Sequence, residues 1–286
     1  MPRTITDKVV LVTGASSGLG KALATALLRR GAKVAATFRK QDQADAFTGS
    51  HPQNALGVVM DITDTAAIDS GVSTIVDRFG RIDILANNAG VGTLGAVEET
   101  SDAEARRIFD VNFFGALAVN RAVLPIMRQQ GSGHIFQYSA IGGFIGYPGL
   151  GVYAAAKGAT DIVGEALAAE VKPLGIDVTV LTIGIFETEF AGTSIKHTDA
   201  TIADYADTPA GKTKGMFETL QGNQPNVPEN GADAIIALME ADAPPVHAAL
   251  GADAMGGMRK KMGDIEGELA AWEANAASTA RAAQAA

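Results

Sequence analysis

Hydrophobic and polar positions along the 286-residue chain follow two alternating patterns. Short runs rich in Val, Ile, Leu and Ala are typical of strands buried on both faces, and longer segments repeat their apolar residues at helical spacing. The first pattern predicts strands at residues 9–12, 33–38, 56–60, 82–86, 134–139, 176–182 and 246–250. The second predicts helices at residues 18–30, 65–79, 101–130, 151–173 and 230–240. Such alternation indicates βαβ units and a parallel sheet.

These elements predict an α/β fold, a Rossmann-type, doubly wound three-layer sandwich with a mostly parallel seven-stranded sheet. Residues 1–263 are interpreted as a single domain, because no linker separates the strands. The polar stretch at about 187–228 is expected to be a substrate loop, either a lid over an apolar substrate or a solvated segment with its own packing cluster. The Ala-rich residues 264–286 are expected to form a C-terminal helix or tail. A kink is expected at Pro125, inside the predicted helix 101–130.

Composition narrows the classes of function. A formal net charge of −9 disfavours nucleic acid and anionic membranes as partners. The absence of Cys excludes disulfides, thiolate metal sites and a cysteine nucleophile. The four His are scattered without metal-ligand spacing, so no metal is predicted. With no apolar stretch of membrane-spanning length and no signal-peptide core at the start, we expect a soluble, cytoplasmic protein.

A glycine-rich turn joins the first predicted strand to the first predicted helix. Its sequence, T-G-A-S-S-G-L-G, begins at Thr13. Glycines permit a tight turn and close approach of a pyrophosphate, to which the helix N-terminus presents free N–H groups. The alternative is a turn that merely connects two elements. The candidate cofactor-binding residues here are Gly14, Ser16, Ser17, Gly18, Leu19 and Gly20.

The end of the second predicted strand indicates which dinucleotide binds. An acidic residue at this position would bind the ribose 2′-hydroxyl of NAD, but Arg39 and Lys40 stand there instead. A guanidinium can bind a 2′-phosphate through two hydrogen bonds. The sequence therefore favours NADP(H), with NAD(H) as the alternative, unless both cations are simply solvated.

Three residues have the types and positions that acid–base chemistry requires. Tyr153 and Lys157 lie four residues apart, on one face of a predicted helix. The pKa of a free phenol is near 10, and a neighbouring ammonium is expected to lower it. Ser139 ends the fifth predicted strand, where open α/β sheets bind ligands, and its hydroxyl can donate to a substrate oxygen. Taken alone, Ser139 is equally typical of a turn residue.

Together these motifs resemble the classical short-chain dehydrogenase/reductase family over about residues 5–252. Further matches are Asp61, the N-N-A-G motif at 87–90, and Asn112 within V-N-F-F-G. The resemblance implies that Asp61 and the adjacent Ile62 contact adenine, and that Asn88, Ala89 and Gly90 lie beside the adenosine. It also implies that Asn112, Ser139, Tyr153 and Lys157 form a catalytic tetrad, in which Asn112 holds a proton-relay water and Lys157 also binds the nicotinamide ribose.

One segment departs from the family pattern. After the sixth predicted strand Gly184 and Thr188 match, but Ile183 stands where the family has proline. The resemblance implies that Gly184, the Phe186 backbone and Thr188 contact the nicotinamide end, where the missing proline removes a φ restraint. Candidate substrate contacts are Ile141, Tyr147 and Phe190.

The function that follows is hydride transfer between NADP(H) and a small-molecule carbonyl or secondary alcohol, with Tyr153 as acid and base. Two alternatives remain: epimerase or dehydratase chemistry on the same fold, and a non-catalytic dinucleotide sensor. The resemblance also implies a homodimer or homotetramer.

Overall fold

The computed structural model describes residues 3–190, 194–220 and 222–281. Its main sheet has seven strands in the order β3-β2-β1-β4-β6-β7-β9, and every pairing is parallel. The strands are β1 (Val9–Val12), β2 (Lys33–Phe38), β3 (Ala55–Val59), β4 (Ile84–Asn87), β6 (Gly133–Tyr138), β7 (Ile176–Ile183) and β9 (His247–Leu250). The predicted Rossmann-type sheet is confirmed.

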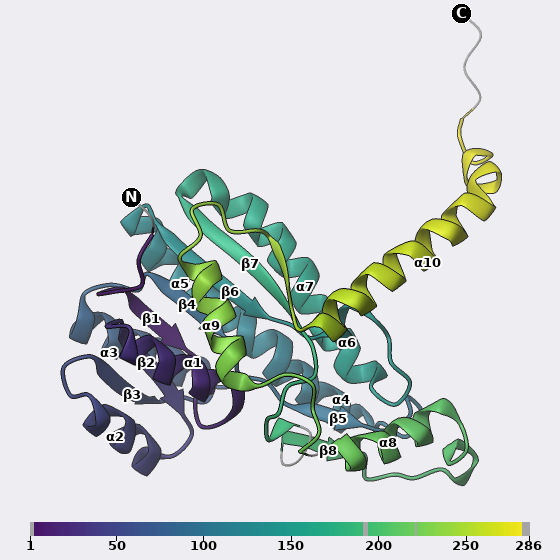
Figure 1. Ribbon diagram of the computed structural model, residues 1–286, viewed down its shortest axis with the longest axis horizontal. Helices are drawn as coiled ribbons and strands as arrows, with labels where there is room; N and C mark the ends of the chain where they lie inside the picture. Colours follow the sequence, from purple (N-terminus) through teal and green to yellow (C-terminus); the bar gives the residue numbers. More distant parts are fainter. Residues whose placement is uncertain (1–2, 191–193, 221, 282–286) are drawn as a thin grey trace, which may run out of the picture.

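Helices cover both faces of this sheet, which makes the three layers visible in Figure 1. Helices α1 (Gly18–Arg29) and α9 (Pro228–Met239) pack on one face, and α3 (Thr65–Phe79), α5 (Ala116–Gln130) and α7 (Gly151–Val171) pack on the other. Within β1, Val10 and Val12 belong to the first core cluster, whereas Val9 and Leu11 belong to the second. Successive side chains of a strand point to opposite faces, so an unbroken apolar run serves both cores.

The strand order places a topological switch point between β1 and β4. The chain runs outward from β1 to β2 and β3, and then returns to form β4 on the other side of β1. Ligands of open α/β sheets bind outside the carboxyl ends of the strands at such a point. The turn after β1 and the N-N-A-G segment after β4 therefore face the same crevice.

The predicted helix at 101–130 is three pieces in the structure. Helix α4 (Asp102–Phe109) leads into a π-helical turn (Asp110–Gly115) and then into α5. Helix α5 continues through Pro125, and the π turn interrupts the regular helix before it. Gly115 ends this turn where a Cβ would lie 2.8 Å from the carbonyl oxygen of Ile62. Single π turns of this kind are frequent at functional sites, and this one carries Asn112.

Several elements lie outside the predicted pattern. They are α2 (Gln41–Ser50), α6 (Ile141–Phe144), α8 (Pro209–Leu220), the first half of α10 (Ala252–Ala277), and the small parallel pair β5 (Gly92–Leu94) and β8 (Ile195–His197). Helix α2 buries only Ala44 fully, so its sequence shows almost no apolar periodicity. Helix α10 crosses the boundary predicted at residue 263. Within the described ranges, no helix is long and apolar enough to cross a bilayer.

Candidate functional site

The turn after β1 packs against the segment after β4, and its glycines make this close approach feasible. Gly14 and Gly18 have φ angles of 68° and 57°, which side chains rarely tolerate. A Cβ on Gly14 would lie 2.9 Å from Ala89 Cα, and a Cβ on Gly20 would lie 2.5 Å from the carbonyl oxygen of Gly14. The glycine spacing thus has a steric cause.

Side-chain hydrogen bonds hold the turn in place. The Asn88 amide donates to the carbonyl oxygens of Thr13 at 2.8 Å and Gly14 at 3.1 Å. In return, the buried Thr13 hydroxyl accepts from the backbone N–H groups of Asn88 and Ala89. Sequence reasoning missed Thr13, although a polar residue at the end of an apolar strand was the available signal.

The start of α1 suits the pyrophosphate of a dinucleotide. Ser17 precedes the helix and its side chain makes no capping hydrogen bond, and no acidic residue occupies the first turn of this described helix. Ser16, Ser17 and Gly18 at this helix start help to line a cavity of about 810 Å³, together with Thr188. Uncapped N–H groups at a helix N-terminus are a natural anion site.

The adenosine candidates lie at the ends of β2 and β3. One Asp61 carboxylate oxygen accepts from the Thr63 backbone N–H at 2.9 Å and from the Thr63 hydroxyl at 2.7 Å. These bonds hold the Asp61 pKa below its usual value, and the positive charge of Arg39 lowers it further. Arg39 and Lys40 are exposed, whereas Ile62 is buried. This electrostatic effect indicates that Arg39 and Asp61 lie near each other at the same end of the sheet.

Tyr153 and Lys157 are both buried on α7, and 6% of each is exposed. The Lys157 ammonium donates to the carbonyl oxygen of Tyr138 at 2.8 Å. Burial lowers the Lys157 pKa to about 8. Burial also raises the Tyr153 pKa above its usual value, and the charge of Asp161 adds to this increase. The pKa of Tyr153 is therefore raised where a lowering was expected, because burial disfavours the charged phenolate.

Asn112 lies beside Lys157 at the end of β4. Its amide donates to the Val91 carbonyl at 2.7 Å, and its oxygen accepts from the Val91 N–H at 3.0 Å. A Cβ on Gly90 would lie 2.8 Å from the Asn112 side-chain oxygen and 3.4 Å from Lys157 Nζ. The glycine of the N-N-A-G motif therefore lets both polar groups approach the strand end.

Ser139 is buried directly after β6, and its hydroxyl lies beside the carboxylate of Asp161. A Cβ on Gly143 would lie 2.6 Å from Ser139 Oγ and 3.0 Å from Asp161 Oδ2, yet no well-formed hydrogen bond joins the two groups. Among the described residues, neither Ser139 Oγ nor Asp161 Oδ1 has a hydrogen-bond partner. Buried polar groups are normally paired, so this pair of groups points to a ligand or water partner.

Asp161 is a residue that sequence reasoning missed. Burial raises its pKa to about 6, against the opposing effects of the Ser139 hydroxyl and the Lys157 ammonium. Its position four residues after Lys157 on α7 was the available signal, because that spacing places both side chains on one helix face.

Side-chain hydrogen bonds restrain the backbone after β7, where Ile183 ends the strand in place of the family's proline. Asp253 of α10 accepts from the Ile185 N–H at 2.7 Å, and Asn226 donates to the Ile185 carbonyl at 2.8 Å. Asn226 also donates to Asp253 at 2.9 Å, which closes the network. The segment containing Gly184 is therefore restrained by two side chains that sequence reasoning missed.

A family model described as "short chain dehydrogenase" matches residues 8–199. The chain belongs to this family. It is accordingly an oxidoreductase of the NAD(P)-dependent short-chain dehydrogenase class, with the fold and crevice described above.

Three relatives illustrate the similarity. "Oxidoreductase BOA17" of Botryotinia fuckeliana is 35% identical over 249 residues, which cover 87% of this chain and 90% of the relative. A short-chain dehydrogenase structure from Streptomyces avermitilis is 35% identical with a TM-score of 0.88, covering 96% and 100% of the two chains. The 3-ketoacyl-(acyl-carrier-protein) reductase of Brucella melitensis, solved with NADH, is 28% identical with a TM-score of 0.73, covering 88% and 98%.

The substrate candidates of this short-chain dehydrogenase lie in different surroundings. The Phe190 ring lies against Tyr153, with 5.6 Å between ring centroids. Ile141 belongs to α6, which adjoins Tyr153, since a Cβ on Gly142 would lie 3.5 Å from that ring. Tyr147 is 37% exposed. An apolar cluster around Tyr153 adds residues that sequence reasoning missed: Leu94, Leu150, Ile195 and Phe217.

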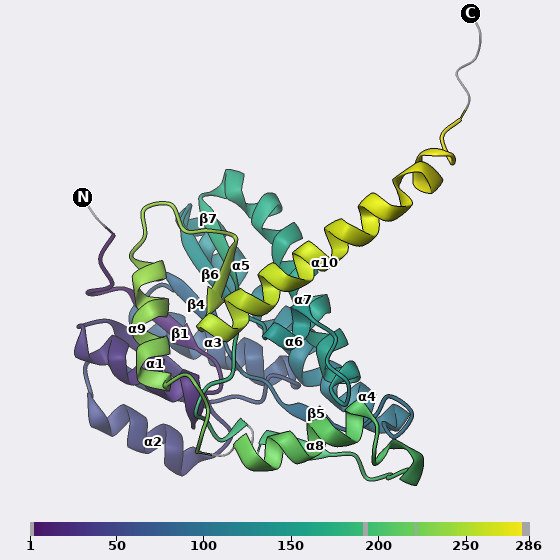
Figure 2. The same ribbon diagram turned by 45° about the vertical axis from the view of Figure 1, so that its right-hand side comes forward.

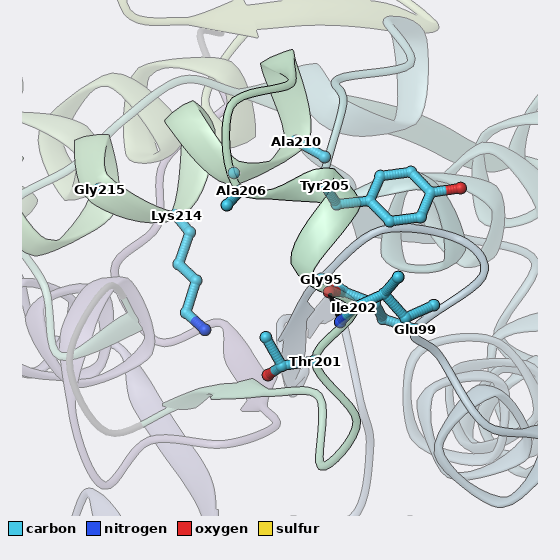
Figure 3. Close-up of a pocket in the computed structure, with 10 residues that line it drawn as sticks. Gly95, Glu99, Thr201, Ile202, Tyr205, Ala206, Ala210, Lys214 and Gly215 are labelled. Carbon is cyan, nitrogen blue, oxygen red and sulfur yellow. Dashed lines mark hydrogen bonds between the residues drawn. The ribbon is translucent and has the colours of Figure 1, made fainter.

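A second cavity of about 310 Å³ lies between residues 201–215, which include the start of α8, and the segment after β5. Figure 3 shows the Lys214 amine extending toward Thr201, and the Tyr205 ring turned away from Lys214. Glu99 attaches this loop to the body by accepting from the backbone N–H groups of Ile202 and Ala96, both at 2.8 Å. Neither Tyr153 nor Ser139 lines this cavity, so it lies beside the cluster around Tyr153.

Proposed function

We propose that the protein is an NADP(H)-dependent carbonyl reductase that also catalyses the reverse oxidation of a secondary alcohol. The observation that carries the proposal is the buried cluster of Tyr153, Lys157 and Ser139 at the carboxyl ends of the strands. A binding module has no need to bury an ammonium beside a phenol and an unpaired hydroxyl. Bound NADPH supplies the hydride.

Each side chain of the cluster then has a defined task. Tyr153 donates its proton to the substrate oxygen, and its raised pKa keeps it protonated at neutral pH. Ser139 donates a hydrogen bond to the same oxygen from a hydroxyl that lacks a partner among the described residues. Lys157 holds an ammonium near the strand end, where it binds the nicotinamide ribose. Asn112 holds the water that returns protons to Lys157.

The cofactor-binding residues follow the crevice from end to end. The turn residues Gly14, Ser16, Ser17, Gly18, Leu19 and Gly20 hold the pyrophosphate, Asp61, Ile62, Asn88, Ala89 and Gly90 hold the adenosine, and Gly184, Phe186 and Thr188 hold the nicotinamide. Arg39 and Lys40 hold the 2′-phosphate of NADP(H). The Brucella relative binds NADH, and NAD(H) is the alternative cofactor for this chain.

The decisive assay measures NADPH oxidation by absorbance with a panel of ketones, and NADP⁺ reduction with secondary alcohols. Turnover in either direction supports the proposal. Isomerisation or loss of water with no net change of the cofactor indicates epimerase or dehydratase chemistry instead. Tight NADPH binding without any turnover indicates a dinucleotide sensor.

Replacing Arg39 with Ala is expected to weaken NADPH binding by roughly 30-fold and NADH binding by less than about threefold. The reason is that a charge-assisted bond to a phosphate is worth about 2 kcal/mol, and NADH lacks that phosphate. Calorimetric titration with each cofactor measures both constants. Lys33→Ala at the amino end of β2 is the control, and equal losses for both cofactors in Arg39→Ala would contradict the role of Arg39.

Replacing Asp161 with Asn is expected to move the alkaline limb of kcat/KM for carbonyl reduction down by about one pH unit. The Asp161 charge raises the pKa of Lys157, so its removal lets Lys157 lose its proton at lower pH. The other charged groups that act on Asp161 are Glu165 of α7 and His247 of β9. Glu170→Gln on the same helix is the control, because Glu170 is exposed. An unchanged pH profile of kcat/KM in Asp161→Asn would show that Asp161 does not set the protonation of Lys157.

We further propose that the enzyme forms a homodimer or homotetramer through the outer faces of the π turn and α7. Support comes from two large apolar side chains on these faces, since Phe114 is 56% exposed and Ile162 is 65% exposed. Apolar residues of this size are enriched at interfaces between subunits.

A further inference from the structure

Helix α10 leaves the body of the protein, as Figures 1 and 2 show from two directions. Only its first turns are packed. Ala254 is fully buried, and a Cβ on Gly257 would lie 3.1 Å from Ile145 and 3.2 Å from Ile141. From residue 262 onward, every described residue is exposed. The remainder of the helix is therefore an arm without packing partners in the described chain.

The large apolar residues of α10 form one continuous stripe. They are Met255, Met258, Met262, Ile265, Leu269 and Trp272, separated by three and four residues in strict alternation. This is the a/d repeat of a helix that packs against another helix. The exposed fractions rise to 63% at Leu269 and 68% at Trp272. A stripe of this regularity is typical of a helix–helix seam.

The arm is too weak a helix to persist alone. Residues 262–277 make about four turns, and isolated helices of that length are marginal in water. Gly263 and Gly267 lie in open space on the arm, and each costs about 1 kcal/mol relative to alanine. A partner that covers the apolar stripe supplies the missing stability.

The charges that flank the stripe indicate the partner. Arg259 and Lys261 flank its first half, whereas Glu266, Glu268 and Glu273 flank its second half. Two copies of this helix placed antiparallel bring Arg259 opposite Glu266 and Lys261 opposite Glu268, twice each. Parallel copies would keep only Lys261 opposite Glu266 and would place Glu268 opposite Glu273, so each attractive pair would be offset by a repulsive one. Charge complementarity therefore favours an antiparallel second copy.

We propose that α10 is an arm that pairs antiparallel with α10 of a second copy of this chain. The pairing stacks Met262 on Ile265, Met258 on Leu269 and Met255 on Trp272 of the other copy. This seam is separate from the helix faces proposed above for the oligomer, and it does not depend on the proposed activity. The Lys261 ammonium also donates to the carbonyl oxygen of Phe144, and this hydrogen bond holds the positive charge of Lys261 at the edge of the stripe.

The first test is the oligomer mass in solution, measured by light scattering on the full chain. The double variant Ile265→Asp, Leu269→Asp is expected to have half the wild-type mass. The control Ala270→Asp, Ala271→Asp adds the same charge to the same helix away from the stripe, and it is expected to keep the wild-type mass. An unchanged mass in the stripe variant, or an equal loss in the control, overturns the proposal.

The second test is disulfide cross-linking, for which the chain offers a background free of cysteine. In antiparallel pairing, an equal mixture of Met258→Cys and Leu269→Cys chains is expected to cross-link only as a mixed dimer. Two Leu269 residues would then lie roughly 16 Å apart along the axis, beyond the reach of a disulfide. Self-cross-linking of Leu269→Cys indicates parallel pairing, and no cross-link in the mixture indicates another occupant; either result overturns the proposal.

Discussion

Replacing Tyr153 with Phe is expected to lower kcat for carbonyl reduction by about 10³-fold, while the Kd for NADPH changes by less than about threefold. Loss of a positioned acid typically costs 10²- to 10⁴-fold in rate. The substitution removes one oxygen atom and keeps the ring, so the contact with Phe190 in the apolar cluster persists. The protein should therefore fold and bind cofactor as before.

Single-turnover kinetics and calorimetric titration of the same preparation separate the two effects. Tyr205→Phe is the matched control, because its hydroxyl lies on the exposed loop and bonds to Glu98 at 2.7 Å. That control is expected to retain wild-type kcat. If Tyr153→Phe kept more than about one tenth of the wild-type kcat, another group would have to be the proton donor.

Replacing Lys157 with Met is expected to lower kcat/KM by about 10³-fold and to remove the alkaline limb of its pH profile. The Lys157 pKa is lowered to about 8, so the wild-type enzyme loses its ammonium, and with it activity, as the pH rises through about 8. Methionine is unbranched like lysine, is one atom shorter, and carries no charge at any pH. The variant should therefore show a low and flat profile in this range.

The control for this variant concerns folding. Lys157→Met leaves the Tyr138 carbonyl without its donor, which costs about 1–3 kcal/mol of stability. Urea unfolding of the variant measures that cost, and Lys212→Met, at an exposed lysine of α8, controls for the substitution itself. A variant that is folded and yet as active as the wild type at pH 7 would remove Lys157 from the mechanism.

The strands and the cofactor turn were predictable because their signals are local. An unbroken apolar run such as Val9–Val12 has apolar side chains on both faces of the strand, so it predicts a strand that is buried on both faces. Gly14 and Gly18 take the positive φ angles that the turn itself requires, and glycine meets this local demand. The spacing of Tyr153 and Lys157 follows from the period of a helix. For the same reason the strand boundaries are correct to within two residues.

Other features depend on contacts between distant parts of the chain. Asp253 and Asn226 restrain the segment after β7 only because β9 brings the start of α10 to that strand end. The π turn lies in a segment whose sequence is typical of ordinary helix, and Gly115 at its end packs on the distant Ile62. The rise in the Tyr153 pKa depends on burial in the apolar cluster around that ring and on the charge of Asp161, and residue spacing measures neither.

The sequence by itself therefore determined the sheet, the turn after β1 and the residue types of the proposed tetrad, because the periodicity of strands and helices and the conformational freedom of glycine act over a few residues. Only the tertiary structure decided the electrostatics of the site, since desolvation depends on everything that surrounds a group. It also decided the course of α10. The apolar stripe of that helix is present in the sequence, but its exposure follows only from the absence of any described element that covers it.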